Sequence, residues 1–308
     1  MGAMTVAPRP TIAFRLIAAL SRFALSPVET VSPEKARREL ERSSRGPGWL
    51  VGYGRDLASV IDESVAGVPV RRYRPHDARS GTIVFFHGGG WMLGSIETHD
   101  RLARAMAAET THEVVSVEYR RAPEHRYPAA LDDALAVTRA LVALGRVAVA
   151  GDSAGGNLAA SVANLVPVAG QFLMYPVTDC AEERPSHESY AIDHVLTREA
   201  IRYFRREYVP DAAQRYESGP SPIRAASLAD SAPAYLVIAQ CDVVRDEGVA
   251  YAERLQKAGV AVTLDEVPGS LHGFMSMLGL RPARAALQRA APWLRSRLQS
   301  QAAVSTHA

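Results

Sequence analysis

The sequence predicts an α/β fold in which a mostly parallel sheet is covered by helices on both faces. Short apolar runs, such as residues 82–86, 146–150 and 234–239, alternate along the chain with helical patterns. Apart from Thr82 and Arg146 at their starts, these runs are continuously apolar, which is typical of parallel strands that are buried on both faces. One of these runs ends abruptly in a turn of small residues, 151–156, and a helical pattern follows directly. Alternation of this kind favours a single doubly covered sheet over an all-helical or all-β fold.

The composition indicates an ordinary globular protein with one large domain. The chain has 308 residues, of which 47% are hydrophobic and 22% are charged, and its formal net charge is +2. No run of like charges marks a nucleic-acid-binding tail, so nucleic acid is excluded as an expected partner. The two cysteines, Cys180 and Cys241, lack the number and spacing of a disulfide framework or zinc site, which favours a reducing, cytoplasmic compartment. We expect free thiols, although a bridge is possible if the strands ending near Tyr175 and Ala239 are neighbours.

The first fifty residues have helical patterns that are broken by Pro27, Pro33 and the Gly-Pro-Gly cluster at 46–48. Residues 12–25 are apolar, but Arg15 and Arg22 interrupt them. The sequence therefore predicts neither a signal peptide nor stable membrane insertion. Instead, four apolar residues at spacings of four, four and three predict an amphipathic helix: Ile12, Leu16, Leu20 and Phe23.

The remaining elements can be placed by periodicity. Strands are predicted at 68–73, 82–86, 113–119, 146–150, 171–175, 234–239 and 260–267. Helices are predicted at 100–109, 129–144, 157–165, 246–258 and 281–299. Between 178 and 221 the strands stop, which indicates an insertion on the side of the sheet where ligands bind in such folds. The predicted organisation is an N-terminal helical cap segment (1–55), a catalytic domain (56–177 and 222–308) and a cap insertion (178–221).

The turn Gly151-Asp152-Ser153-Ala154-Gly155 fits G-x-S-x-G, in which small residues let a strand turn sharply into a helix and expose the serine hydroxyl. A serine nucleophile needs a base to take its proton and a carboxylate to orient that base. His272 follows the last strand in a loop between two glycines. Asp242 directly follows the strand before it, so serine, acid and histidine occur in the order found in this type of fold.

Other assignments of the acid and the base remain open at this stage. Asp246 is the nearest rival acid, although it opens a helix, where an aspartate usually caps backbone N–H groups. Asp179, after the preceding strand, is a second rival. The other histidines lie in turn, helical, cap or tail contexts that favour structural roles: His76, His99, His112, His125, His187, His194 and His307.

Donors for an oxyanion are expected from two places. One is the backbone N–H of Ala154, directly after the nucleophile. The other is the loop His87-Gly88-Gly89-Gly90, whose glycines let the backbone approach a substrate oxygen closely. Gly88 and Gly89 are the predicted donors in this loop. A phosphate-binding role for the loop is disfavoured, because neither Lys-Ser/Thr nor G-x-G-x-x-G is present.

Taken together, several motifs resemble the hormone-sensitive-lipase-like family of esterases, with the α/β-hydrolase fold. They are His87-Gly88-Gly89-Gly90-Trp91, Tyr119-Arg120-Arg121-Ala122-Pro123-Glu124-His125, Pro128-Ala129-Ala130-Leu131-Asp132-Asp133-Ala134, Gly151-Asp152-Ser153-Ala154-Gly155-Gly156-Asn157-Leu158, Tyr175-Pro176, Asp242-Val243-Val244-Arg245-Asp246-Glu247-Gly248 and Leu271-His272-Gly273-Phe274. The likeness extends from about Val68 to the last helix. Val243-Val244 departs from the usual Pro-Leu of the family.

The resemblance implies a serine carboxylesterase with Ser153 as nucleophile, Asp242 as acid and His272 as base, and a structural role for His87. It implies a small-molecule ester as substrate, and no metal or organic cofactor. Trp91 and aromatic cap residues could restrict the acyl pocket to short or medium chains, or could form the core of the cap. An amidase or lactonase with the same triad, or a non-catalytic ligand-binding protein on the same fold, are the alternatives. The alternating segment 261–267 could be an edge strand through which two copies pair.

Overall fold

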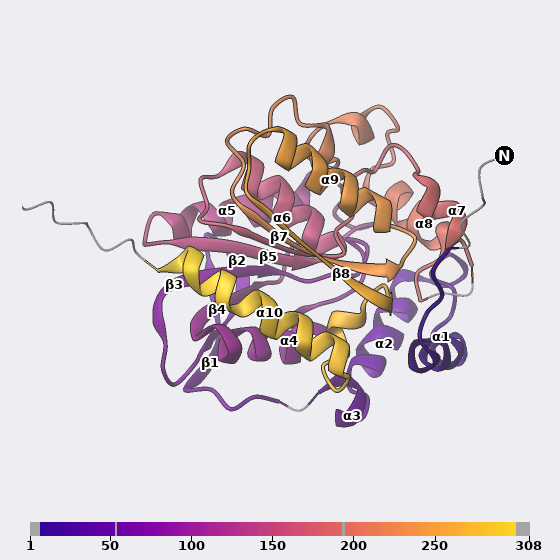
Figure 1. Cartoon of the computed structure of the whole chain (residues 1–308), viewed down its shortest axis with the longest axis horizontal. Helices are drawn as coiled ribbons and strands as arrows, with labels where there is room; N and C mark the ends of the chain where they lie inside the picture. Colours follow the sequence, from indigo (N-terminus) through magenta and orange to yellow (C-terminus); the bar gives the residue numbers. More distant parts are fainter. Residues whose placement is uncertain (1–6, 53, 193–194, 300–308) are drawn as a thin grey trace, which may run out of the picture.

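The computed structural model describes residues 7–52, 54–192 and 195–299. At its centre lies one eight-stranded sheet in the order β1-β2-β4-β3-β5-β6-β7-β8 (Figure 1). The strands are β1 (Ser59–Val65), β2 (Val68–Arg74), β3 (Arg79–Phe86), β4 (His112–Val117), β5 (Val147–Asp152), β6 (Gln171–Met174), β7 (Ala234–Cys241) and β8 (Val262–Leu271).

The strands from β4 to β8 in this order pair in parallel, whereas β1 and β2 form an antiparallel hairpin at one edge. Ala66 and Gly67 connect this hairpin, and both have positive φ, as a two-residue turn between twisted strands requires. At the opposite edge lies β8, which covers the segment predicted to be an edge strand. Pairing of two copies there stays a prediction.

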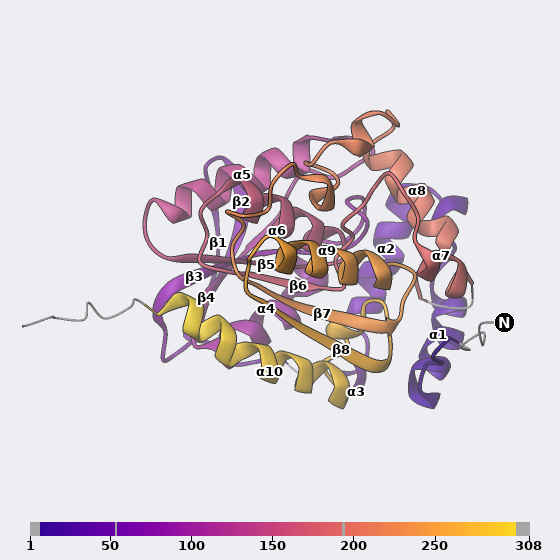
Figure 2. The same ribbon diagram turned by 45° about the horizontal axis from the view of Figure 1, so that its top comes forward.

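Helices cover both faces of the sheet, as predicted. α4 (Ile96–Thr110) and α10 (Arg281–Leu298) pack on one face (Figures 1 and 2). On the other face lie α5 (Ala129–Val142), α6 (Ala154–Leu165) and α9 (Arg245–Lys257). Two clusters of buried apolar side chains, one on each face, form the core. The middle strands are buried along their whole length, which explains why their sequences are continuously apolar.

The remaining helices gather at the carboxyl ends of β7 and β8 (Figures 1 and 2). From the N-terminal segment come α1 (Ile12–Ala24), α2 (Pro33–Ser44) and α3 (Gly48–Val51), and from the insertion come α7 (Pro185–Ser189) and α8 (Arg198–Tyr208). Short 3₁₀ turns complete the fold: η1 (Val28–Thr30), η2 (Gln214–Tyr216), η3 (Pro222–Arg224) and η4 (Phe274–Ser276). We refer to α1, α2, α3, α7 and α8 as the cap. The division of the chain into domains stays a prediction.

The predicted amphipathic helix forms as α1, but its larger apolar stripe faces outward. Phe14 and Ala18 are the buried residues of α1. Phe14 packs edge to face against Phe274, with ring centroids 6.3 Å apart. Periodicity therefore identified the helix, but not the side that contacts the protein.

Candidate active site

The turn after β5 holds Ser153 in a strained conformation between strand and helix. Its φ of 54° and ψ of −117° lie outside the regions that residues with side chains usually adopt. Gly151 and Gly155 are required on either side. A Cβ at Gly151 would lie 2.2 Å from the carbonyl oxygen of Gly155, and one at Gly155 would lie 2.0 Å from that of Phe86. Small residues at these positions thus allow the tight strand-turn-helix that presents the Ser153 hydroxyl.

The structure brings the three predicted triad residues together. His272 Nε2 lies 2.8 Å from Ser153 Oγ, and His272 Nδ1 lies 2.7 Å from Asp242 Oδ2. These distances suit a hydroxyl that gives its proton to Nε2, while Nδ1–H donates to the carboxylate. Asp242 is buried, and its other carboxylate oxygen accepts the N–H of Val244 at 3.1 Å.

The loop that carries His272 is fixed from two sides. Gly273 has a φ of 78°, a left-handed conformation that glycine adopts without strain, and η4 starts directly after it. The ring of Tyr175 packs against that of His272 with centroids 4.8 Å apart. The Val243-Val244 departure does not displace the acid, since both valines are buried and Asp242 still reaches the histidine.

Neither rival acid reaches the histidine. Asp246 accepts the backbone N–H of Ser186 in α7 at 2.9 Å and pairs with Arg245. It lies inside α9 rather than at its N-cap, which is Val244. Asp179 forms a bidentate pair with Arg224 at 3.0 and 2.9 Å. Asp246 therefore holds α7 of the cap in place, whereas Asp179 holds η3.

The oxyanion loop corrects one prediction. Gly88 N–H donates to Asp152 Oδ1 at 2.8 Å, so it is not free to bind a substrate oxygen. Within the described residues, no hydrogen bond occupies the backbone N–H of Gly89, Gly90 or Ala154. Ala154 opens α6, where the first N–H groups have no acceptor within the helix. Gly90, which the sequence prediction omitted, therefore replaces Gly88 as a candidate donor beside Gly89 and Ala154.

Asp152 connects the two halves of this candidate hole. It precedes Ser153, lies buried, and contacts both Gly88 and His99 Nε2 of α4, the latter at 3.3 Å. Burial is the largest single influence on the pKa of Asp152 and would raise it, but His99, the Gly88 N–H and His87 together lower it. Burial is likewise the largest influence on the pKa of His99 and would lower it, but Asp152, the Ser95 backbone and Glu118 together raise it. The sequence placed His99 among structural histidines, and nothing in its helical context pointed to this partner.

Replacing His99 by glutamine is expected to destabilise the fold in a pH-dependent way. Because the pKa of His99 is raised, the His99–Asp152 ion pair contributes fully to the free energy of unfolding below the ordinary pKa of histidine, about 6.5. This contribution is lost as pH rises through the raised pKa. Breaking a buried pair costs about 3 kcal/mol. We therefore expect the loss in free energy of unfolding to be largest near pH 6 and to shrink toward pH 9 in urea titrations. A loss that is constant over this range would contradict a charged His99. His76→Gln, at an exposed histidine, is the control.

His87 is in no position to transfer protons. Burial lowers its pKa to about 3, so the ring is neutral at ordinary pH. The ring stacks on Tyr119 at 4.3 Å, and the Tyr119 hydroxyl donates to the His87 carbonyl at 2.7 Å. These contacts agree with the structural role that the resemblance implied.

The cap covers the oxyanion loop with aromatic side chains of α8. A Cβ at Gly90 would lie 2.3 Å from the ring of Phe204, so this ring rests directly on the glycine. Trp91 has no exposed surface and stacks on Tyr208 with centroids 4.4 Å apart. Trp91 thus contacts the cap rather than open space. Its burial argues against the predicted place in the substrate pocket. Phe204 is the better candidate for a wall of the acyl site.

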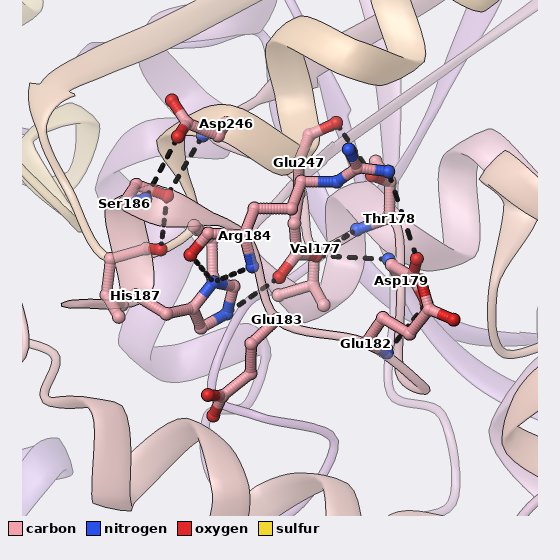
Figure 3. A network of polar contacts seen from close by, with 12 residues as sticks. Val177, Thr178, Asp179, Glu182, Glu183, Arg184, Ser186, His187, Asp246 and Glu247 are labelled. Atoms are coloured by element: carbon pink, nitrogen blue, oxygen red, sulfur yellow. Dashed lines mark hydrogen bonds and ion pairs between the residues drawn. The ribbon is translucent and has the colours of Figure 1, made fainter.

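A buried ionic cluster joins the cap to the helix that follows the acid (Figure 3). Glu247 of α9 has no exposed surface, and one of its oxygens contacts both Arg205 of α8 and His187 Nε2 of α7, the latter at 3.0 Å. Its other oxygen accepts the N–H groups of Thr178 and Asp179 at 2.9 and 3.0 Å. Burial is the largest single influence on the pKa of Glu247 and would raise it, but Arg205, His187 and the Thr178 N–H together lower it.

The thiols of the two cysteines contact backbone carbonyls of Pro220 and Pro8 and not the triad. Cys180 and Cys241 are buried and free, and burial raises their thiol pKa values to about 12 and about 11, so neither is poised as a nucleophile. Among the described residues, no group of three His, Cys, Asp or Glu side chains could hold a metal ion. His194 and His307 lie outside the described residues.

Residues 83–276, more than half of the chain, match a family described as having the alpha/beta hydrolase fold. The chain belongs to this family. Among its α/β-hydrolase relatives, ethyl acetate hydrolase of Pseudomonas putida is 38% identical over 275 residues, which cover 82% of this chain and 86% of that protein. Carboxylesterase NlhH of Mycobacterium tuberculosis is 37% identical over 296 residues, or 90% and 93% of the two chains.

Solved structures of ester hydrolases superpose on this chain. The ester hydrolase EH1AB1 from the metagenome of Lake Arreo superposes with a TM-score of 0.86 at 32% identity, over 93% of this chain and 98% of that one. The carboxylesterase EstE1, from a metagenomic library, gives a TM-score of 0.82 at 34% identity, over 88% and 99%. The predicted α/β-hydrolase fold and the resemblance to hormone-sensitive-lipase-like esterases are confirmed.

Proposed function

We propose that this α/β-hydrolase is a serine carboxylesterase that hydrolyses short- to medium-chain acyl esters through an acyl-enzyme on Ser153. The observation that carries the proposal is His272, which bonds Ser153 Oγ through one ring nitrogen and Asp242 through the other. The names of the relatives, ethyl acetate hydrolase and carboxylesterase, support the same reaction class.

In the first step, Ser153 Oγ attacks the acyl carbon of the ester while its proton passes to His272 Nε2. Asp242 accepts the hydrogen bond from Nδ1–H and stabilises the positive charge that forms on the ring. The oxyanion binds at the free N–H groups of Gly89, Gly90 and Ala154. When the tetrahedral intermediate collapses, the C–O bond to the alcohol breaks and the alcohol takes the proton from Nε2.

In the second step, His272 takes a proton from water, and the resulting nucleophile attacks the acyl carbon of the acyl-enzyme. The same N–H groups hold the second oxyanion. Collapse returns the proton to Ser153 Oγ and releases the carboxylic acid. Because the donors are backbone groups fixed in place before reaction, they need no reorganisation as charge develops on the oxygen.

The limit on acyl length rests on the cap. Phe204 lies on Gly90, and Tyr208 lies on Trp91, so aromatic rings cover the oxyanion loop. A series of p-nitrophenyl esters from acetate to palmitate tests this part of the proposal. We expect kcat/KM to be greatest between acetate and octanoate and to fall steeply for longer chains. A maximum at palmitate would contradict it, and matched p-nitroanilides would detect a preference for amides.

Gly90→Ala is expected to lower kcat/KM for p-nitrophenyl butyrate by about 10²-fold, comparable with the loss of one oxyanion donor. The added methyl collides with Phe204, which forces the loop or α8 to move. Gly67→Ala is the matched control, because Gly67 also has positive φ but a Cβ there would meet no atom within 4 Å.

The collision can be separated from backbone strain by a second substitution. In a Phe204→Ala background, the effect of Gly90→Ala should fall to about tenfold or less, since the methyl then has space. An undiminished effect in that background would assign the loss to backbone strain at Gly90, whose φ is 61°, and would exclude the collision with Phe204 as its cause.

A further inference from the structure

Helix α1 presents an apolar stripe to solvent. Ile12, Leu16, Leu20 and Phe23 are 75%, 61%, 64% and 91% exposed. Residues at these spacings lie on one side of a helix, so the four side chains form a continuous row over about three turns. Isolated exposed apolar residues are ordinary on protein surfaces, but a row of four that includes a phenylalanine indicates a contact with something else.

The exposed row belongs to an anchored helix. Phe14, on the opposite side of α1, is buried against Phe274, and Thr11 N–H donates to the Gly269 carbonyl at 3.1 Å. Phe274 and Gly269 both belong to the segment that carries His272. Figures 1 and 2 place α1 at the outer edge of the cap, and none of the labelled helices or strands lies over its outer side. The row is therefore held outward by contacts on the other side of the helix.

The charged residues of α1 itself are basic. Arg15 is exposed on one flank of the row, Arg22 follows seven residues later on the same flank, and Arg9 is exposed just before the helix. The thirteen residues of α1 include no aspartate or glutamate. An apolar face with flanking arginines is the arrangement by which helices lie in the plane of a membrane interface and attract anionic headgroups.

The dimensions favour a lipid surface over another protein. A helix of thirteen residues is about 20 Å long and about 10 Å wide, so the face measures about 200 Å². A stable protein interface needs about 800 Å² from each partner. The helix is also too short to cross the hydrocarbon core of a bilayer, which is about 30 Å thick. None of the described helices is long and apolar enough to span a membrane.

We propose that α1 docks this protein reversibly onto anionic lipid surfaces, with Ile12, Leu16, Leu20 and Phe23 in the headgroup region and the arginines against lipid phosphates. The cap would then face the bilayer, and hydrophobic esters that partition into it would be delivered close to Ser153. The docking surface is separate from the triad, so it can be tested independently of the esterase reaction.

The test is flotation of the full chain with vesicles of phosphatidylcholine containing phosphatidylglycerol, compared with vesicles of phosphatidylcholine alone. We expect binding to the anionic vesicles that weakens as salt is raised, because the arginine contribution is screened. The double variant Leu16→Gln/Leu20→Gln should lower the partition coefficient by about tenfold or more. Leu144→Gln is the matched control, since Leu144 is 84% exposed but lies far along the chain, after α5.

Turnover of water-soluble p-nitrophenyl acetate and the midpoint of thermal unfolding should be unchanged in both variants, which separates loss of docking from loss of fold or of catalysis. Three results would overturn the proposal. They are no flotation of the unmodified chain with anionic vesicles, equal binding to neutral vesicles, and binding that survives the double variant. A dimer in light scattering that the double variant abolishes would assign the row to a protein interface instead.

Discussion

Ser153→Ala is expected to lower kcat/KM for p-nitrophenyl acetate by about 10⁴-fold or more, with little change in stability. The hydroxyl supplies the bond to the acyl carbon, and no neighbouring group can replace it, because both thiols are buried and protonated at ordinary pH. The oxyanion donors remain intact in this variant, so a small residual rate above that in water is expected.

The measurement is an initial-rate assay together with thermal unfolding and reaction with an organophosphate. The phosphonylated peptide of the unmodified chain should contain Ser153, and the variant should take up no label. Ser161→Ala is the matched control: its hydroxyl, in the helix that follows Ser153, donates to the Gly219 carbonyl at 2.7 Å. Losing that bond should cost about 1 kcal/mol of stability and leave turnover within a few fold. An active, folded Ser153→Ala variant would remove the nucleophile assignment.

Asp242→Asn is expected to lower kcat by about 10⁴-fold, the second largest effect. An amide that donates a hydrogen bond to His272 Nδ1 holds the ring in the wrong tautomer, and an amide that accepts one has no negative charge to stabilise the cation. KM should change little, because Asp242 does not touch the substrate.

Asp246→Asn provides the comparison that the sequence left open. Its carboxylate holds Ser186 and Arg245, and none of its contacts reaches His272. We expect a loss of stability of about 1 kcal/mol and a change in kcat of no more than a few fold. The reverse ranking of the two variants in steady-state assays would move the acid role to Asp246.

The sequence was sufficient to predict the fold and the convergence of the three candidate triad residues, because this information is local. Continuous apolar runs identify buried parallel strands, and the residues at strand ends meet at one edge of the sheet. Ser153, Asp242 and His272 each directly follow a parallel strand. Their positions in the sequence therefore already implied that they meet at the same edge of the sheet.

What the sequence missed depends on partners that are distant along the chain. The N–H of Gly88 is occupied by Asp152, 64 residues away, and three adjacent glycines give no indication of which one is taken. Asp246 is held by Ser186, 60 residues away. For α1, the smaller face of Phe14 and Ala18 contacts the protein, because Phe274 offers a ring for Phe14 to pack against.

The cluster around Glu247 limits how the cap can be exchanged between relatives. A buried carboxylate that loses its cation leaves an uncompensated charge, which costs about 3–5 kcal/mol. Arg205 and His187 come from two different cap helices, whereas Glu247 lies five residues after Asp242 on the catalytic side. A chimera whose foreign cap lacks the arginine and the histidine at these positions would therefore be destabilised beside the acid of the triad. In recombination among such hydrolases, the cap and the start of α9 should be inherited together.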